Sequence, residues 1–398
     1  MKSANATYTF HRCLGRGGFG EVYLATRTGA EGLDRKVAVK VLRSDLPDPE
    51  LALARLKDEA RLLAMLNHPA IVAALELTKL HGRIALVTEY VEGTDLSRFC
   101  TPARRLPPRV ILAIASEVAG ALECAHGTPS PETGKPLHLV HRDVKPENIR
   151  LSRHGDVKLL DFGIARSAEV VREARTTSGN MPFTPGYTAP EAFVALRQEG
   201  PADLFALGAT MYRLLVSERF YEGVRLTEQA ALSSAPDRFA EYVAGRLEKL
   251  PDLHPELAPL VRDCLAYDPA DRPSAEDLQS RAEIIAEAIG GPTPRRWARD
   301  AQFPDERAVE GASLLGLTLS EDRPGDSVII QQGARTVQAS PVSATPRPSR
   351  DRMPLRSPQA QAQAPFPWMI MGMGFVSLGI GAAILAISAF VAGLMMGW

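Results

Sequence analysis

The stretch GRGGFGEV, from residue 15 to residue 22, constrains the fold of this chain more than any other feature. Gly15, Gly17 and Gly20 have the spacing G-x-G-x-x-G, which in dinucleotide-binding folds leads directly into a helix. Here the residues that follow, EVYLATR, alternate as a strand does, so we predict a glycine-rich hairpin with Val22 at the start of its second strand. Because glycine has no Cβ, such a hairpin can lay backbone N–H groups over phosphates.

Hydrophobic periodicity predicts a small β-rich lobe followed by a larger helical lobe. The strand-like runs of the first lobe cover residues 8–15, 21–27, 36–42, 71–80 and 83–90, and a helical pattern covers residues 50–67. From residue 109 onward most patterns are helical. We therefore predict an α+β fold of two lobes, with a cleft between them that is a natural site for a ligand.

The composition excludes some classes of function. The 398 residues include 46 Lys and Arg against 47 Asp and Glu, so no excess of positive charge indicates a nucleic-acid partner. The four cysteines lack the paired short spacings of a zinc site and the density of a disulfide framework, which suits a reducing cytoplasm. The N-terminal residues contain no apolar run that could serve as a signal peptide, so we expect the domain after them to stay in the cytoplasm.

Two charged residues of the first lobe are predicted to meet in the cleft. Lys40 lies on the third strand between Val39 and Val41, and Glu59 lies on the helix that follows. A lysine on a strand is usually a solvated charge, but one flanked by valines on a sheet can point into the cleft. Pairing with Glu59 would fix its position and keep it charged.

The ten residues VHRDVKPENI, from residue 140 to residue 149, gather basic, acidic and amide side chains into one short loop. An exposed, solvated loop is the simplest reading of such a stretch. The loop supplies Asp143, Lys145 and Asn148, and the later stretch LLDFGIAR supplies Asp161. Carboxylate and amide oxygens are the ligands that Mg²⁺ prefers, usually together with substrate phosphates.

In this order and at these spacings, the motifs resemble those of the protein kinase superfamily. Lys145, two residues after Asp143, is the serine/threonine pattern, and the domain looks like the bacterial Hanks-type serine/threonine kinases. Later markers agree, namely APE ending at Glu191, DLFALG beginning at Asp203, and DRPSA with Arg272. In the family this arginine pairs with the glutamate of APE. The resemblance implies the bilobal kinase fold and ATP as the nucleotide.

The resemblance implies a role for each motif residue. Asp143 would orient a substrate hydroxyl and accept its proton, and Lys145 would neutralise the phosphoryl group in transfer. Lys40, positioned by Glu59, would grip the α- and β-phosphates. The metal ion, Mg²⁺ with Mn²⁺ as an alternative, would be held by Asn148 and Asp161.

Further residues complete the nucleotide site and its support by the same resemblance. The glycine hairpin, from Gly15 to Val22, would cover the phosphates. Glu89 and Val91 follow the gatekeeper Thr88 and would bind adenine through their backbone. His141 matches the hydrophobic spine of the family, together with Phe162, and serves packing rather than chemistry.

The segment TTSGNMPFT is predicted to carry regulatory phosphorylation. Thr176, Thr177 and Ser178 are the candidate sites, because Arg142, directly before the loop aspartate, can pair with a phosphothreonine in kinases of this type. Ordinary loop hydroxyls are the alternative. Thr184 is expected to have a structural role beside the loop aspartate. Phenylalanine stands before it where the family commonly has glycine, which leaves the peptide preference open.

The C-terminal part of the chain is predicted to hold it at a membrane. We expect a kinase domain over residues 8–289, a linker rich in Pro, Ser and Arg over 290–367, and a transmembrane helix over 368–398. The last segment contains no charged residue, and a buried helix of a soluble core is the alternative. Arginines stand on its N-terminal side only, at positions 347, 350, 352 and 356, so the kinase domain is expected in the cytoplasm. This makes a single-pass anchor in the cytoplasmic membrane.

Three functions compete on the sequence. The first is an active kinase with protein substrates, which the long segment between Asp161 and Glu191 favours. The second is a catalytically silent kinase fold that acts as a scaffold or nucleotide sensor at the membrane. The third is a small-molecule kinase of related fold. A homodimer that phosphorylates in trans could form through Gly393 and Gly397, one G-x-x-x-G pair, or through the kinase domains.

Overall fold

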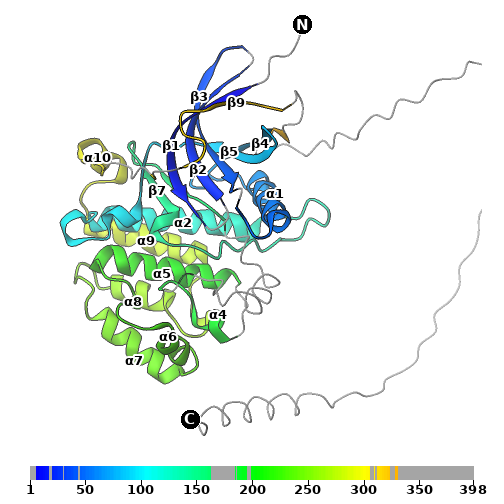
Figure 1. The fold of residues 1–398 in the computed structure, drawn as a ribbon. Coiled ribbons are helices and arrows are strands. Elements are labelled where there is room, and N and C mark those ends of the chain that lie inside the picture. The colour runs from blue at the N-terminus through cyan, green and yellow to red at the C-terminus, as the bar shows by residue number, and fades with distance from the viewer. Residues whose placement is uncertain are drawn as a thin grey trace, which may run out of the picture. The chain divides into compact units, whose positions relative to one another are not determined.

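The computed structural model of this chain describes residues 6–329 except for 18–19, 30, 44, 163–183, 185, 195–198, 305–308, 310–311 and 323–327. All of the described residues belong to one compact unit, which extends to Thr336. The predicted transmembrane segment and the three predicted phosphorylation sites lie outside the described residues. Within the described part, a curled sheet stands over a bundle of helices, so the predicted bilobal α+β fold is confirmed (Figure 1).

The first lobe is a seven-stranded sheet in the order β10-β4-β5-β3-β2-β1-β9. Its strands are β1 (Thr7–Arg16), β2 (Gly20–Thr28), β3 (Asp34–Leu42), β4 (Ala74–Leu80), β5 (Arg83–Glu89), β9 (Thr318–Ser320) and β10 (Val328–Ile329). One helix, α1 (Pro49–Met65), packs beside it. Asp48 caps this helix by accepting the Leu51 N–H at 2.9 Å, and proline fits its first turn.

The alternation along β3 determines which side chains face the cleft. Val37, Val39 and Val41 are buried in the core of the sheet with Tyr8, Phe10 and Tyr23 as neighbours in the same cluster. Successive residues of a strand point to opposite faces. Ala38 and Lys40 therefore face the other side, where both line the cavity between the lobes.

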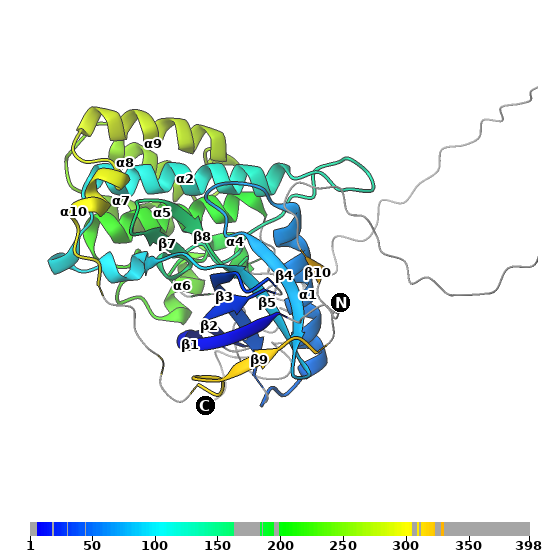
Figure 2. The same ribbon diagram turned by 90° about the horizontal axis from the view of Figure 1, so that it is seen from above.

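The second lobe is helical, and its longest helix runs through its centre. The helices are α2 (Pro108–Gly127), α4 (Pro190–Val194), α5 (Gly200–Val216), α6 (Leu226–Leu232), α7 (Pro236–Leu247), α8 (Leu257–Cys264), α9 (Ala275–Ile289) and α10 (Pro294–Asp300). In the view from above, α2 and α9 lie side by side (Figure 2). Among the described helices, α2 alone has the length and apolar composition to cross a membrane, and most of it is buried, as in the core helix of a folded domain.

A second, small sheet lies where the lobes meet. It consists of β6 (Gly93–Asp95), β7 (Ile149–Ser152) and β8 (Val157–Leu159), in that order. The loop VHRDVKPENI leads through the short 3₁₀-helix η3 (Pro146–Asn148) into β7. The sheet thus joins the segment that links the lobes to the loop that carries the acidic motif residues. Three further 3₁₀-helices are η1 (Leu96–Phe99), η2 (Pro102–Arg104) and η5 (Pro269–Asp271).

The folded domain extends beyond the boundary predicted from the sequence. Part of the predicted linker forms α10, whose Trp297 packs edge-on against Phe99 with ring centroids 5.4 Å apart. Further along, β9 pairs with β1, and β10 pairs with β4 at the other edge of the sheet (Figure 2). The linker expected over residues 290–367 stays a prediction, and the described residues from 294 to 329 within it include α10, β9 and β10. Residues 312–320, ASLLGLTLS, are more apolar than the rest of the expected linker, and their Leu314 and Leu319 are buried against the sheet.

Candidate nucleotide and catalytic site

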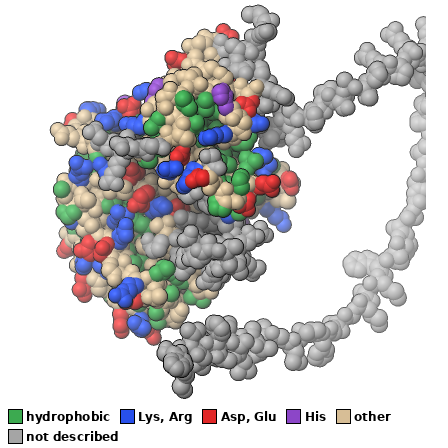
Figure 3. Space-filling model, viewed as in Figure 1, with side chains coloured by type: hydrophobic (Ala, Val, Ile, Leu, Met, Phe, Trp, Pro, Cys, Tyr) green, Lys and Arg blue, Asp and Glu red, His purple; other side chains and the backbone are tan. Residues whose placement is uncertain are grey.

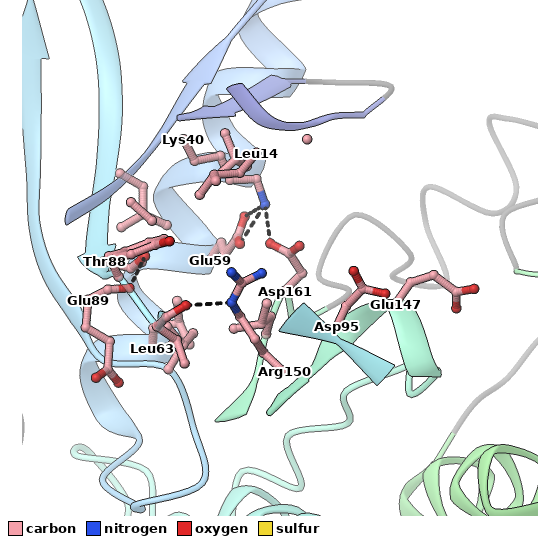
Figure 4. Close-up of a pocket in the computed structure, with 18 residues that line it drawn as sticks. Leu14, Lys40, Glu59, Leu63, Thr88, Glu89, Asp95, Glu147, Arg150 and Asp161 are labelled. Atoms are coloured by element: carbon pink, nitrogen blue, oxygen red, sulfur yellow. Dashed lines mark hydrogen bonds and ion pairs between the residues drawn. The ribbon is translucent and has the colours of Figure 1, made fainter. Parts of the chain in front are cut away.

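A cavity of about 220 Å³ lies between the lobes (Figure 4). Its lining includes several of the residues predicted for the nucleotide site, namely Gly15, Val22, Lys40, Glu59, Glu89, Val91 and Asp161. Thr88, at the predicted gatekeeper position, also lines it. The cavity thus brings together residues from β1, β2, β3, α1 and the segment that links the lobes.

Lys40 joins the two lobes inside this cavity. Its Nζ donates to both carboxylate oxygens of Glu59, at 2.8 and 2.9 Å, and to Oδ1 of Asp161 at 3.0 Å, and both carboxylates point at it in Figure 4. Burial opposes the charge on Lys40, but Asp161 and Glu59 outweigh it and raise its pKa. Lys40 in turn lowers the pKa of Asp161. Burial raises the pKa of Glu59, although Lys40 opposes the rise.

The glycine hairpin closes the cavity from the side of the sheet. A Cβ at Gly20 would lie 2.9 Å from the carbonyl oxygen of Val41, so the hairpin can approach β3 only with glycine there. The N–H of Gly17 donates to the carbonyl of Gly20 at 2.8 Å and closes the turn. Gly15 lines the cavity from β1.

Asp143 accepts hydrogen bonds from three side chains. Lys145 Nζ donates to its Oδ2 at 2.8 Å, and Asn148 Nδ2 to the same oxygen at 2.9 Å. Thr184 Oγ1 donates to Oδ1 at 2.9 Å and lies 3.3 Å from Lys145 Nζ. Two motif residues of the loop, Lys145 and Asn148, thus donate to the carboxylate of the third, and Thr184 lies beside it.

Asp203 holds the backbone of this loop. Its two carboxylate oxygens accept the N–H groups of His141 and Arg142, at 2.7 and 2.8 Å, and Asp203 is almost completely buried. Arg142 has a φ of 65°, and Asp161 a φ of 50°, which are unfavourable for residues with a Cβ. Such strain persists only where surrounding contacts enforce it, and here the buried carboxylate of Asp203 provides them for the loop.

His141 is buried as a neutral ring between two hydrogen bonds. Its Nε2 lies 2.9 Å from the carbonyl of Leu160, and its Nδ1 accepts the N–H of Asp143 at 3.3 Å. These contacts assign the proton to Nε2. Burial lowers the pKa of the imidazole. The ring packs on Phe162 with centroids 4.6 Å apart, so both residues contribute to packing, as the family pattern implies.

Asn148 and Asp161 suit a magnesium ion that also binds phosphates. The Nδ2 of Asn148 is directed at Asp143, to its backbone oxygen at 2.8 Å and its carboxylate, so the Oδ1 atom of the amide is left to accept or ligate. Asp161 presents a carboxylate to the same cavity as Lys40. One amide and one carboxylate oxygen are a typical protein share for Mg²⁺, since phosphates and water supply the other ligands.

The predicted pair of Arg272 and Glu191 forms as a bidentate ion pair below the site. Nη1 and Nη2 of Arg272 each donate to one oxygen of Glu191 at 2.7 Å. The guanidinium also donates to the carbonyls of Pro201, Ala266 and Tyr267, and its side chain is fully buried. Every strong donor of this buried cation is therefore used to hold α4 to the helical lobe.

Some residues of the site were not predicted from the sequence. Asp95, Glu147 and Arg150 line the cavity. Glu147 and Arg150 flank Asn148 within two residues, so proximity to the loop was a usable signal for them. The side chain of Glu89 faces away and pairs with Lys158 at 2.6 Å, which leaves only the backbone of that residue to the cavity.

Comparison with known proteins identifies the class to which this fold and site belong. Residues 8–282 match the protein kinase domain. The chain is 32% identical over 317 residues to the serine/threonine-protein kinase PkaB of Streptomyces coelicolor, covering 78% of this chain and 69% of PkaB. It is 34% identical over 273 residues to the serine/threonine-protein kinase PknL of Mycobacterium tuberculosis, covering 67% of this chain and 64% of PknL.

A third relative carries a different name. The tyrosine-protein kinase MasK of Myxococcus xanthus is 34% identical over 338 residues, covering 82% of this chain and 50% of MasK. This chain therefore spans between half and about two thirds of the length of these relatives. The chain belongs to the protein kinase family, and within it to the bacterial Hanks-type serine/threonine protein kinases.

Proposed function

We propose that this chain is an active kinase that transfers the γ-phosphoryl group of ATP to serine and threonine hydroxyls of proteins. The observation that carries the proposal is the contact of Lys40 with both Glu59 and Asp161, which aligns the two lobes around one cavity. A silent scaffold would not need this arrangement together with a loop carboxylate that accepts three side-chain donors.

The residues divide the reaction among them. ATP supplies the phosphoryl group, and Asn148 and Asp161 would hold Mg²⁺, which would supply positive charge against the phosphates. Lys40 binds the α- and β-phosphates. Asp143 orients the substrate hydroxyl and takes its proton as the hydroxyl oxygen bonds to the γ-phosphorus and the bond to ADP breaks. Lys145 lies 2.8 Å from Asp143 and adds positive charge beside the transferred group.

Phosphate transfer from labelled ATP to the chain itself or to a generic basic protein tests the proposal. Lys40→Met and Asp143→Asn should each lower the rate by orders of magnitude, because each removes a charge that the reaction uses. Lys36→Met is the matched control, since Lys36 is on the same strand with its side chain exposed. Nucleotide binding without any turnover by the wild type would instead establish the silent scaffold or sensor.

We also propose that residues 368–398 anchor the chain in the cytoplasmic membrane with the kinase domain in the cytoplasm. The absence of charge in this segment and the arginines before it support the proposal. A chain that ends near residue 365 should become soluble and keep its kinase activity. Full-length protein found in the soluble fraction, or a kinase domain open to protease outside intact cells, would contradict this topology.

Activation by autophosphorylation is proposed for Thr176, Thr177 or Ser178. Arg142 directly precedes the loop aspartate, and its guanidinium is of the kind that pairs with a phosphothreonine. Mass spectrometry of active protein should find phosphate on at least one of these residues, and the triple alanine variant should lose activity. A homodimer that phosphorylates in trans predicts that the specific rate of autophosphorylation rises with protein concentration.

A further inference from the structure

The cavity between the lobes has a cation in one of its walls. From the sheet side, Val22 and Ala38 line it with apolar side chains, whereas β7 in the other lobe contributes Arg150 (Figure 4). A flat base bound in this cavity would lie between these two walls. Ligand cavities are lined mostly by apolar side chains with a few placed polar groups, so a guanidinium at this position bears directly on which ligand is accepted.

The guanidinium of Arg150 is fixed to the segment that links the lobes. Its Nε donates to the carbonyl of Val91 at 2.7 Å, and its Nη2 donates to the carbonyl of Gly93 at 2.8 Å. These two donors form one edge of a rigid planar fork. The guanidinium carbon also lies 5.9 Å from the centre of the Tyr90 ring. Arg150 is therefore a built part of the cavity wall and not a solvated surface charge.

Local backbone geometry brings the linking segment within reach of this arginine. Strand β6 pairs with β7, with Asp95 opposite Arg150 and Gly93 opposite Ser152. A Cβ at Gly93 would lie 2.1 Å from the carbonyl oxygen of Leu151, so only glycine lets the two strands lie this close. From β7 the guanidinium of Arg150 then reaches the carbonyls of Gly93 in β6 and of Val91 just before it.

The backbone carbonyl and N–H of Val91 consequently differ in their hydrogen bonding. Its carbonyl already accepts the Arg150 Nε–H. Its N–H has no backbone acceptor among the described residues and can donate to a ligand. A purine whose N1 accepts from this N–H would place any 2-amino group beside N1, against a carbonyl that is already occupied and next to the N–H donors of a cation. The 2-amino N–H would have to share the Val91 carbonyl with the Arg150 Nε–H and would lie beside the N–H donors of a cation, which repel it.

We propose that Arg150 is a specificity-determining residue that disfavours 6-aminopurine nucleotides with an added 2-amino group. The inference rests on the proposed binding of ATP in this cavity. It assigns discrimination to one side chain in β7 that the transfer reaction itself does not use. Adenine and 2-aminoadenine can pair N1 and the 6-amino group with the backbone in the same way. A difference between their affinities therefore comes from the contacts of the 2-position, where Arg150 acts.

The test compares ADP with the diphosphate of 2-aminoadenosine, by calorimetric titration of the full-length chain with Mg²⁺ present. Wild type should bind 2-aminoadenosine diphosphate several-fold more weakly than ADP. In Arg150→Met the Val91 carbonyl is released to accept the 2-amino group, so the preference for ADP should fall by about fivefold, the worth of one net hydrogen bond. Arg150→Lys, which has a single point donor, should give an intermediate ratio.

A ratio of affinities separates specificity from a structural role, because a general loosening of the cavity weakens both ligands alike. Arg153→Met is the matched control, since the Arg153 side chain is about half exposed just beyond β7 and does not line this cavity, and its ratio should equal that of wild type. Equal or tighter binding of 2-aminoadenosine diphosphate by wild type would overturn the inference, and so would an unchanged ratio in Arg150→Met. Failure of wild type to bind ADP at all would overturn the proposed function as well.

Discussion

The burial of residues 312–320 against the sheet predicts a stability difference among four leucines that lie within six residues of this segment. Leu314 and Leu319 are 6% and 8% exposed and belong to the core of the sheet, whereas Leu315 and Leu317 are 38% and 46% exposed. The segment is held by the backbone as well, since Leu317 O accepts the N–H of Phe10 at 2.9 Å. Replacement of each leucine by alanine therefore isolates side-chain burial within one segment.

The magnitude follows from the area each side chain hides. Truncation of a buried leucine to alanine costs about 2–5 kcal/mol, and the lower end applies here because a short edge segment can partly collapse onto the gap. We expect Leu314→Ala and Leu319→Ala each to lower the free energy of unfolding by about 2–3 kcal/mol. At roughly 2–4 °C per kcal/mol, the unfolding midpoint should fall by about 4–12 °C. Replacement of the exposed leucines should change the free energy of unfolding by about 0.5 kcal/mol or less.

Thermal unfolding of the full-length chain, followed by differential scanning fluorimetry, measures these shifts. Leu315→Ala and Leu317→Ala serve as the matched controls, because they make the same chemical change on the same segment. The KM for ATP should also rise in the two buried variants. The N–H of Val309 donates to the carbonyl of Cys13, and the next residue, Leu14, lines the nucleotide cavity. Loss of the segment should therefore make this wall of the cavity more mobile. Equal shifts in all four variants, or none, would refute the docking of this segment.

Two further predictions concern the buried polar groups. Burial lowers the pKa of His141 below its usual 6.5, so on acidification the unfolded chain takes up a proton more readily than the folded chain does. The free energy of unfolding should therefore fall between pH 7.5 and 5.5. His141→Gln should make this fall smaller, whereas replacement of the exposed His154 by Gln should not. In Arg272→Met the buried partner of Glu191 is lost, which should cost about 3–5 kcal/mol. The double variant with Glu191→Gln should cost less than the sum of the single changes, and additive losses in chemical denaturation would show that the pair is not coupled.

Side chains of both charges are mixed on the surface of the molecule. On the face seen in Figure 3, Lys and Arg side chains are interspersed with Asp and Glu over both lobes. Binding along a phosphate backbone needs a continuous basic stripe, because affinity comes from many neighbouring cations. Among the described residues on this face, charges of both signs are interspersed instead.

The sequence by itself determined the position of a side chain wherever strand alternation or a short motif was enough to place it. The valines that alternate with Lys40 in β3 determine that it faces away from the core of the sheet, because successive side chains of a strand point to opposite faces. Asp143, Lys145 and Asn148 lie within six residues, so chain connectivity alone keeps them together. The uncharged run after residue 367 predicts a membrane anchor from hydropathy, and it stays a prediction because it lies outside the described residues.

Only the tertiary structure decided which distant partners these side chains meet. Lys40 contacts Asp161 across 121 residues, and the N–H of Leu314 reaches the Tyr23 hydroxyl across 291 residues. A local pattern determines the face on which a side chain lies, whereas its partner depends on how whole lobes pack. Arg150 illustrates the difference, since in sequence it is one arginine in a strand. It becomes a wall of the nucleotide cavity only because Gly93 lets β6 lie against β7.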